Sequence, residues 1–145
     1  MKKILYSLLI FSSATVFAQK NPNVKFAVSN DAVGTVALFD SKKEHVQKVN
    51  VFKTKANLPQ SLKKYEFLAD NGLSEVTFKN NFGILDNTSL ANFNEQSGLP
   101  KDTPVFIEGY EFKNTDIKIY ADIIADLKVE IVDGKKALFI TTNKK

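Results

Sequence analysis

Apolar and polar residues alternate over most of the chain after position 23, and this period of two predicts a strand-rich domain. In the first such segment Val24, Phe26 and Val28 share one face, and Ser29-Asn30-Asp31 ends the run. Further strands are expected over Val46 to Lys53, Leu62 to Ala69, Leu73 to Lys79, Val105 to Phe112, Ile117 to Ile131 and Lys136 to Thr142.

Two of these strands form the strongest local prediction, a hairpin around Asp70-Asn71-Gly72. Tyr65 and Phe67 lie on one face before the turn, and Val76 and Phe78 lie on one face after it. Asn and Gly accept the positive φ that tight hairpin turns require. A second turn is expected at Asp133-Gly134, before the last strand.

The period changes before residue 100, where one short helix is predicted over Leu90 to Gln96. Asn87-Thr88-Ser89 offers capping side chains, and Leu90 and Phe93 lie on the same side of the helix. Ser97-Gly98 ends the helix and Pro100 prevents its continuation.

Two segments have alternative interpretations. Thr35 to His45 is either a strand that ends near Asp40 or a short helix. Every odd position from Ile117 to Ile131 is apolar, which is too long for one flat strand in a small domain. We expect a bend or bulge near Ala125, and a helix through Tyr120, Ile123, Ile124 and Leu127 is the alternative.

The predicted element order after the N-terminal region is three strands, a helix and two strands. This order is typical of an OB-fold, a five-stranded partly open barrel with its helix between strands three and four. The expected fold is therefore mainly β: an OB-like five-stranded barrel with one short helix, plus a C-terminal hairpin.

The first eighteen residues have the pattern of a cleavable secretory signal peptide. Lys2 and Lys3 precede the apolar run Ile4 to Phe11, which is too short for a membrane span, and Val16-Phe17-Ala18 fits a signal peptidase site. Residues 19–145 are then a single β-rich domain, located in the periplasm or secreted. We expect no transmembrane segment after removal of the leader.

Composition excludes several classes of function. The chain has no Cys, so disulfides, thiolate metal sites and a lipid-modified cysteine are excluded. All 20 basic residues are Lys, and the net charge is only +4. Recognition of phosphate and guanine relies on the Arg fork, so nucleic acid is not an expected partner.

Several stretches resemble the bacterial OB-fold family of small periplasmic stress-tolerance proteins. They are the segment from Lys64 to Gly72 with Val76 and Phe78, then Pro100-Lys101-Asp102-Thr103, Val105 to Gly109, and Asp116-Ile117-Lys118-Ile119. Thr35-Val36-Ala37 and Val46 to Val51 can be aligned with the family's short helix and first strand, so the resemblance covers about Thr35 to Ile124.

The resemblance implies a periplasmic binding or stress-tolerance role without catalysis, and it carries over no active site. The chain departs from the family at Asn50, where a glycine is usual, and in its longer loop from Asn80 to Thr103. The final hairpin from Lys128 to Thr142 has no counterpart in the family.

Candidate catalytic or metal-binding groups are few. His45 is the only histidine, and it is interpreted as a solvated loop residue because no second His or Cys accompanies it. The acidic residues of the C-terminal half show no calcium-loop spacing and are interpreted as a solvated strand face. They are Asp116, Asp122, Asp126, Glu130 and Asp133. Gly83 and Gly109 are isolated, so no phosphate-binding loop is expected. No cofactor, metal site or catalytic residue is predicted.

The outer face of the early strands is the candidate binding surface, because OB-folds bind ligands there. Its polar and aromatic residues are Lys48, Asn50, Phe52, Lys64, Glu66, Glu75, Thr77 and Lys79, with Leu68 beside them. The balance of charge favours a small polar ligand, an envelope glycan or an envelope protein; a plain solvated face is the alternative.

The sequence therefore predicts a non-enzymatic, periplasmic OB-like binding protein, with envelope stress tolerance as its setting. The alternative is a structural or accessory subunit of a cell-envelope assembly, whose last hairpin adds a strand to a neighbour's sheet. A hydrolase using scattered carboxylates is the third hypothesis, and it requires two carboxylates that face each other in a pocket.

Overall fold

The computed structural model describes residues 24–143, which form two compact units. Among the described residues, 24–30 and 34–83 belong to unit 1, and 31–33 and 84–143 belong to unit 2. The expected leader lies outside the described residues. No helix in the described part of the chain is long and apolar enough to cross a membrane.

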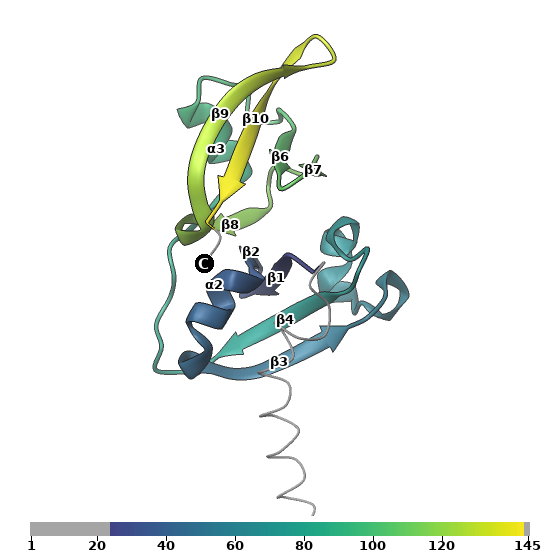
Figure 1. Cartoon of the computed structure of the whole chain (residues 1–145), viewed down its shortest axis with the longest axis vertical. Helices are drawn as coiled ribbons and strands as arrows, with labels where there is room; N and C mark the ends of the chain where they lie inside the picture. The colour runs from purple at the N-terminus through teal and green to yellow at the C-terminus, as the bar shows by residue number, and fades with distance from the viewer. Residues whose placement is uncertain (1–23, 144–145) are drawn as a thin grey trace, which may run out of the picture. The chain divides into compact units, whose positions relative to one another are not determined.

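Unit 1 contains three strands in the order β3-β4-β1 (Figure 1). β3 (Val46–Phe52) is antiparallel to β4 (Leu73–Phe78), and β1 (Phe26–Ser29) is parallel to β4. In β3 and β4 the predicted alternation places one face in the core, as at the paired and buried Val49 and Val76. β1 is buried on both faces.

The ambiguous segment after residue 35 is a helix, α2 (Val36–Ser41), followed by the 3-10 turn η1 (Lys43–His45). The Thr35 hydroxyl accepts a hydrogen bond from the backbone N–H of Leu38 at 3.1 Å, so Thr35 is an N-cap. Leu38 and Phe39 are buried. Local capping therefore selects the helix over the strand.

The expected hairpin strand Leu62 to Ala69 is wrong. Residues 60–68 form the 3-10 helix η3 (Gln60–Leu68), which follows a shorter one, η2 (Lys55–Asn57). Leu62, Tyr65 and Leu68 are its buried residues, and their spacing of three matches three residues per turn. Tyr65 and Phe67 were interpreted as one face of a strand, but only Tyr65 is fully buried. The turn itself is present, with Gly72 at a φ of 99°.

Unit 2 contains a four-stranded mixed sheet in the order β7-β6-β10-β9 (Figure 1). β6 (Val105–Ile107) pairs antiparallel with β7 (Tyr110–Phe112) and parallel with β10 (Lys135–Thr142). β10 also pairs antiparallel with β9 (Ile124–Val132). β10 is thus central, and its Leu138 and Ile140 are buried.

A second group of paired segments in unit 2 consists of β8, β5 and the first two residues of β2, in the order β2-β8-β5. β8 (Lys118–Tyr120) is parallel to β2 (Ala32–Thr35), which it meets at Ala32 and Val33, and antiparallel to β5 (Asn87–Ser89). The 3-10 turn η4 (Ala121–Ile123) separates β8 from β9. The long alternating segment from residue 117 is therefore two strands with a bend, placed a few residues before Ala125.

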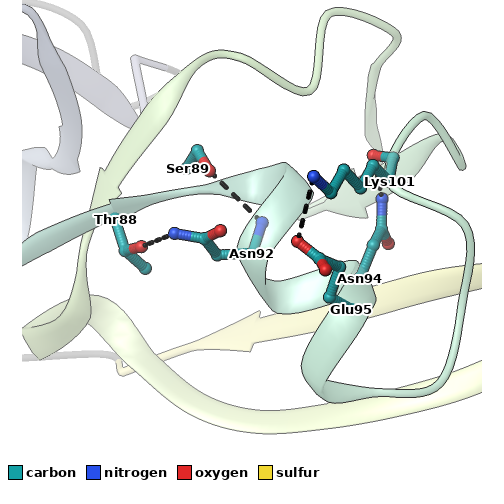
Figure 2. A network of polar contacts seen from close by, with 6 residues as sticks. All are labelled: Thr88, Ser89, Asn92, Asn94, Glu95 and Lys101. Atoms are coloured by element: carbon teal, nitrogen blue, oxygen red, sulfur yellow. Dashed lines mark hydrogen bonds and ion pairs between the residues drawn. The ribbon is translucent and has the colours of Figure 1, made fainter.

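The predicted helix is confirmed as α3 (Leu90–Gln96), with Leu90 and Phe93 buried. The Ser89 hydroxyl caps it by accepting from the N–H of Asn92 at 3.2 Å (Figure 2). From the same helix, the Asn94 side chain donates to the carbonyls of Lys101 and Thr103 at 3.0 and 2.8 Å. These two hydrogen bonds connect the loop after α3 to the helix, and the Asn94 side chain that makes them is fully buried.

The five-stranded OB-like barrel is wrong. The described residues contain ten strands in two mixed sheets, and neither sheet closes into a barrel. Three predicted strands are not single strands: residues 62–69 are helical, η4 divides 117–131, and a turn at Glu108 and Gly109 divides 105–112. Parallel pairings such as β6 with β10 also join segments far apart in sequence, which strand order alone does not reveal.

Candidate interaction site: the free edge of strand β9

β9 is the last strand of the four-stranded sheet, so one of its two edges faces away from β10. It is nine residues long, and its register with β10 is continuous from Val132 to Asp126. Within residues 24–143 no strand pairs with its other edge. A long regular edge presents unpaired backbone N–H and C=O groups, which are a template for a further strand.

The apolar side chains of β9 are exposed. Leu127, Val129 and Ile131 lie on one face and are 36%, 42% and 72% exposed, respectively. They lie opposite Ile140, Leu138 and Lys136 of β10. The apolar face of the sheet core thus continues onto β9 and becomes exposed there.

The opposite face of β9 carries charge. Asp126, Lys128 and Glu130 alternate with the apolar residues and are exposed. Lys128 lies opposite Phe139, whose ring stacks on Phe106 of β6 with centroids 4.8 Å apart. The edge therefore has an apolar face and a face of alternating charge.

The hairpin turn defines which backbone groups of β9 are free. Asp133 and Gly134 form a two-residue loop with positive φ at both positions, and Val132 and Lys135 flank it. Residues that flank such a loop exchange both backbone hydrogen bonds, and bonded and non-bonded pairs then alternate along the ladder. The even-numbered residues of β9 thus bond to β10, and the backbone groups of Leu127, Val129 and Ile131 point to the free edge.

The other sheet edges are less suited to strand addition. β5 and β7 are three residues long. β3 is longer, but its register is irregular between Val46 and Lys48. An irregular register is a common protection against strand addition. Among the described edge strands, β9 has the longest uninterrupted register, with seven consecutive residue pairs to β10.

A groove of about 580 Å³ lies next to the β9–β10 hairpin, within unit 2. It is bordered by the loop after α3, by β6 and β7, and by the hairpin residues Val132, Asp133, Lys135 and Lys136. Phe106 contributes an aromatic surface, and Asp102 and Glu111 contribute carboxylates. The buried Asn94 holds one wall of this groove through Lys101 and Thr103.

The residues of the predicted binding surface are only partly brought together. Lys48, Asn50 and Phe52 of β3 lie opposite Thr77, Glu75 and Leu73 of β4, so five of the eight share one strand-pair face. Lys64 and Glu66 lie instead in η3, because that segment is not a strand. Lys79 follows β4, and its ammonium donates to the Glu44 carbonyl at 2.8 Å.

His45 lies at the end of η1, and its ring stacks on Phe82 with centroids 4.5 Å apart. Its backbone carbonyl accepts a hydrogen bond from the N–H of Lys79 at 2.8 Å. His45 and the acidic residues interpreted as a solvated face (Asp116, Asp122, Asp126, Glu130 and Asp133) are exposed. No group of three or more His, Asp or Glu side chains in the described part could hold a metal ion.

The sequence interpretation did not identify the exposed edge of β9. Leu127, Val129 and Ile131 were recognised as one apolar face, and such a face is normally assigned to the core. The sequence signal for an exposed edge was the length of the alternating run from Ile117 to Ile131, because a strand of that length is too long for a small domain to cover.

Comparisons with protein-family models, curated proteins and solved structures find no match for the chain.

Proposed function

We propose that the protein is a non-enzymatic, exported accessory protein that joins a cell-envelope assembly by pairing the free edge of β9 with a strand of its partner. The observation that carries this proposal is the long, regular edge of β9 with Leu127, Val129 and Ile131 exposed on it. Strand addition is a common mode of recognition, in which backbone hydrogen bonds supply affinity and alternate side chains supply specificity.

Export is supported by the leader pattern of residues 1–18. A mature N-terminus at Gln19, measured by mass spectrometry on protein isolated from the envelope, is the expected result. An uncleaved N-terminus on protein found in the cytoplasm would contradict the export part of the proposal and leave the β9 part standing.

The edge function is tested with two matched variants. Val129 on β9 and Val51 on β3 are both 42% exposed on edge strands. Val129→Lys places a charge in the middle of the proposed contact, and Val51→Lys places the same charge on the other long edge.

The measurement is the size of native complexes extracted from the envelope. We expect wild type and Val51→Lys to migrate above the monomer mass, and Val129→Lys to migrate as a folded monomer. Unchanged complexes with Val129→Lys, or loss of complexes with Val51→Lys alone, would overturn the assignment to β9. Circular dichroism of each variant verifies that the fold is retained.

Deleting the last hairpin would remove more than the free edge of β9, so it does not test the edge function. Residues 128–145 include β10, whose buried Leu138 and Ile140 hold the centre of the four-stranded sheet. Their removal is expected to unfold unit 2, so point substitutions on β9 are the better experiment.

A further inference from the structure

We infer that the strand which pairs with β9 is the β9 strand of a second copy of this chain, antiparallel and centred on Val129. This inference rests on the proposed function and names its partner. The argument comes from the order of charged and apolar residues along β9, together with the backbone groups that its free edge presents.

The backbone restricts the possible registers. In an antiparallel pair, residues that exchange hydrogen bonds lie directly opposite each other. Because the odd-numbered residues of β9 point to the free edge, odd residues of one copy must oppose odd residues of the other. Registers centred on Leu127, Lys128, Val129 and Glu130 all satisfy this condition, and they differ in the side chains that they bring together.

The Val129-centred register is complementary at every position from 127 to 131. Val129 lies opposite Val129, and Leu127 lies opposite Ile131 on each side of the two-fold axis. Lys128 lies opposite Glu130 on the other face, again on both sides. Opposite charges and apolar pairs directly across two strands stabilise a sheet. A two-fold axis repeats each of these pairs, as in most homodimers.

The competing registers are less favourable. Centring on Lys128 places Lys128 against itself and Asp126 against Glu130, and centring on Glu130 places Glu130 against itself. Like charges opposite each other destabilise a sheet. Centring on Leu127 pairs Asp126 with Lys128, but places the exposed Val129 opposite Ala125. Only the Val129 register pairs the three exposed apolar residues with one another.

Pairing in this register would join two four-stranded sheets through their edges. The exposed side chains of Leu127, Val129 and Ile131 would then form one apolar strip across the two-fold axis. A homodimer of this kind also removes the edge that would otherwise recruit further strands.

Charge exchange tests the register directly. In the Val129 register, Lys128→Glu places Glu against Glu130, and Glu130→Lys places Lys against Lys128. We expect each single variant to raise the dimer Kd about tenfold in sedimentation equilibrium, and the double variant to return within about threefold of wild type. The Leu127 register predicts no recovery in the double variant, since Asp126 would then face Glu.

Introduced cysteines provide a second test, because the chain has no Cys of its own. Hydrogen-bonded antiparallel partners have Cα atoms about 5.5 Å apart, within the range that a disulfide spans. Val129→Cys is therefore expected to give covalent dimers under mild oxidation. Leu127→Cys is the matched control. It should run as a monomer on a non-reducing gel after the same oxidation, because residue 127 faces residue 131 of the other copy.

Amide hydrogen exchange gives the third measurement. We expect slow exchange at the even-numbered amides of β9 at all concentrations, and slowing at residues 127, 129 and 131 only as the dimer forms. These tests use protein purified from the envelope, so that processing occurs as in the cell.

The outcomes separate the two proposals. A chain that stays monomeric up to millimolar concentration and forms no Val129→Cys dimer overturns self-pairing. If its native complexes still depend on Val129, edge pairing with a different protein stands. Covalent dimers from Leu127→Cys instead of Val129→Cys would overturn the register. Loss of both self-pairing and the Val129-dependent complexes would overturn both proposals.

Discussion

Glu108 accepts two hydrogen bonds from Thr142, one from its backbone N–H at 3.1 Å and one from its hydroxyl at 2.6 Å. Glu108 lies in the turn between β6 and β7, and Thr142 is the last residue of β10. The contact therefore fastens the end of the central strand to the turn beside its parallel neighbour β6.

Replacing Glu108 with Ala removes the acceptor of both bonds. Because Thr142 is buried, its donors would be left without this partner, and we expect the free energy of unfolding to fall by about 1–3 kcal/mol. Urea denaturation measures the change. Glu111→Ala, on the exposed side of β7, is the control and should stay within about 0.5 kcal/mol of wild type. Equal effects of the two substitutions would contradict the role of the Glu108–Thr142 contact.

Asn94→Ala should destabilise unit 2. The substitution removes the two donors that reach the Lys101 and Thr103 carbonyls, so we expect a loss of about 2 kcal/mol. Asn92→Ala is the matched control on the same helix, since the Asn92 side chain is exposed and donates to the Thr88 hydroxyl at the surface (Figure 2). Thermal unfolding measures both variants, and a control as destabilised as Asn94→Ala would refute the prediction.

Gly72→Ala and Gly83→Ala separate backbone strain from steric contact. Both glycines have positive φ, 99° and 90°, so both variants incur conformational strain. A Cβ at position 72 would lie 2.8 Å from the Phe52 carbonyl oxygen, while nothing lies within 4 Å of one at position 83. We expect Gly72→Ala to be the less stable variant by about 1–3 kcal/mol, measured by chemical denaturation. Similar stabilities would show that the backbone around Phe52 accommodates the methyl group.

The Lys55–Asp70 pair predicts a local pH effect. Its Nζ and Oδ1 atoms are 2.9 Å apart, and this hydrogen bond is the main reason that the pKa of Lys55 is raised. The charged form is favoured in the folded state, so any stabilisation is complete below the unfolded pKa and is lost as pH rises through the folded one.

Asp70→Asn should lower the pKa of Lys55 toward its ordinary value, as followed by NMR titration of the Lys55 side chain. Glu66→Gln should lower it less, because the charge of Glu66 is the smallest of the contributions that raise the pKa. An unchanged titration of Lys55 in Asp70→Asn would show that the ion pair does not determine it.

The elements that sequence reasoning predicted correctly depend on nearby residues. Helix α3 follows from the Ser89 cap three residues before Asn92, and from Leu90 and Phe93 on one face. The Asp133-Gly134 turn follows from two residues that accept positive φ. In both cases the stabilising contacts are formed within a few residues, so a short stretch of sequence contains the information.

The binding surface predicted from the sequence is only partly present in the structure. Lys48, Asn50 and Phe52 share a face because strand alternation places them there. Lys64 and Glu66 were assigned to the same face because Tyr65 and Phe67 mimic alternation, yet Leu62, Tyr65 and Leu68 pack with a period of three. A short apolar pattern can fit both periods, and packing selects between them.

The amino-acid sequence by itself determined helix α3, the turn at Asp133-Gly134, and that Leu127, Val129 and Ile131 share one face of a strand. Only the tertiary structure decided that β10 lies between β6 and β9, which leaves β9 at the edge with these side chains exposed. The physical reason is that alternation records which residues share a face, whereas pairing between strands and burial of that face depend on segments distant in the chain.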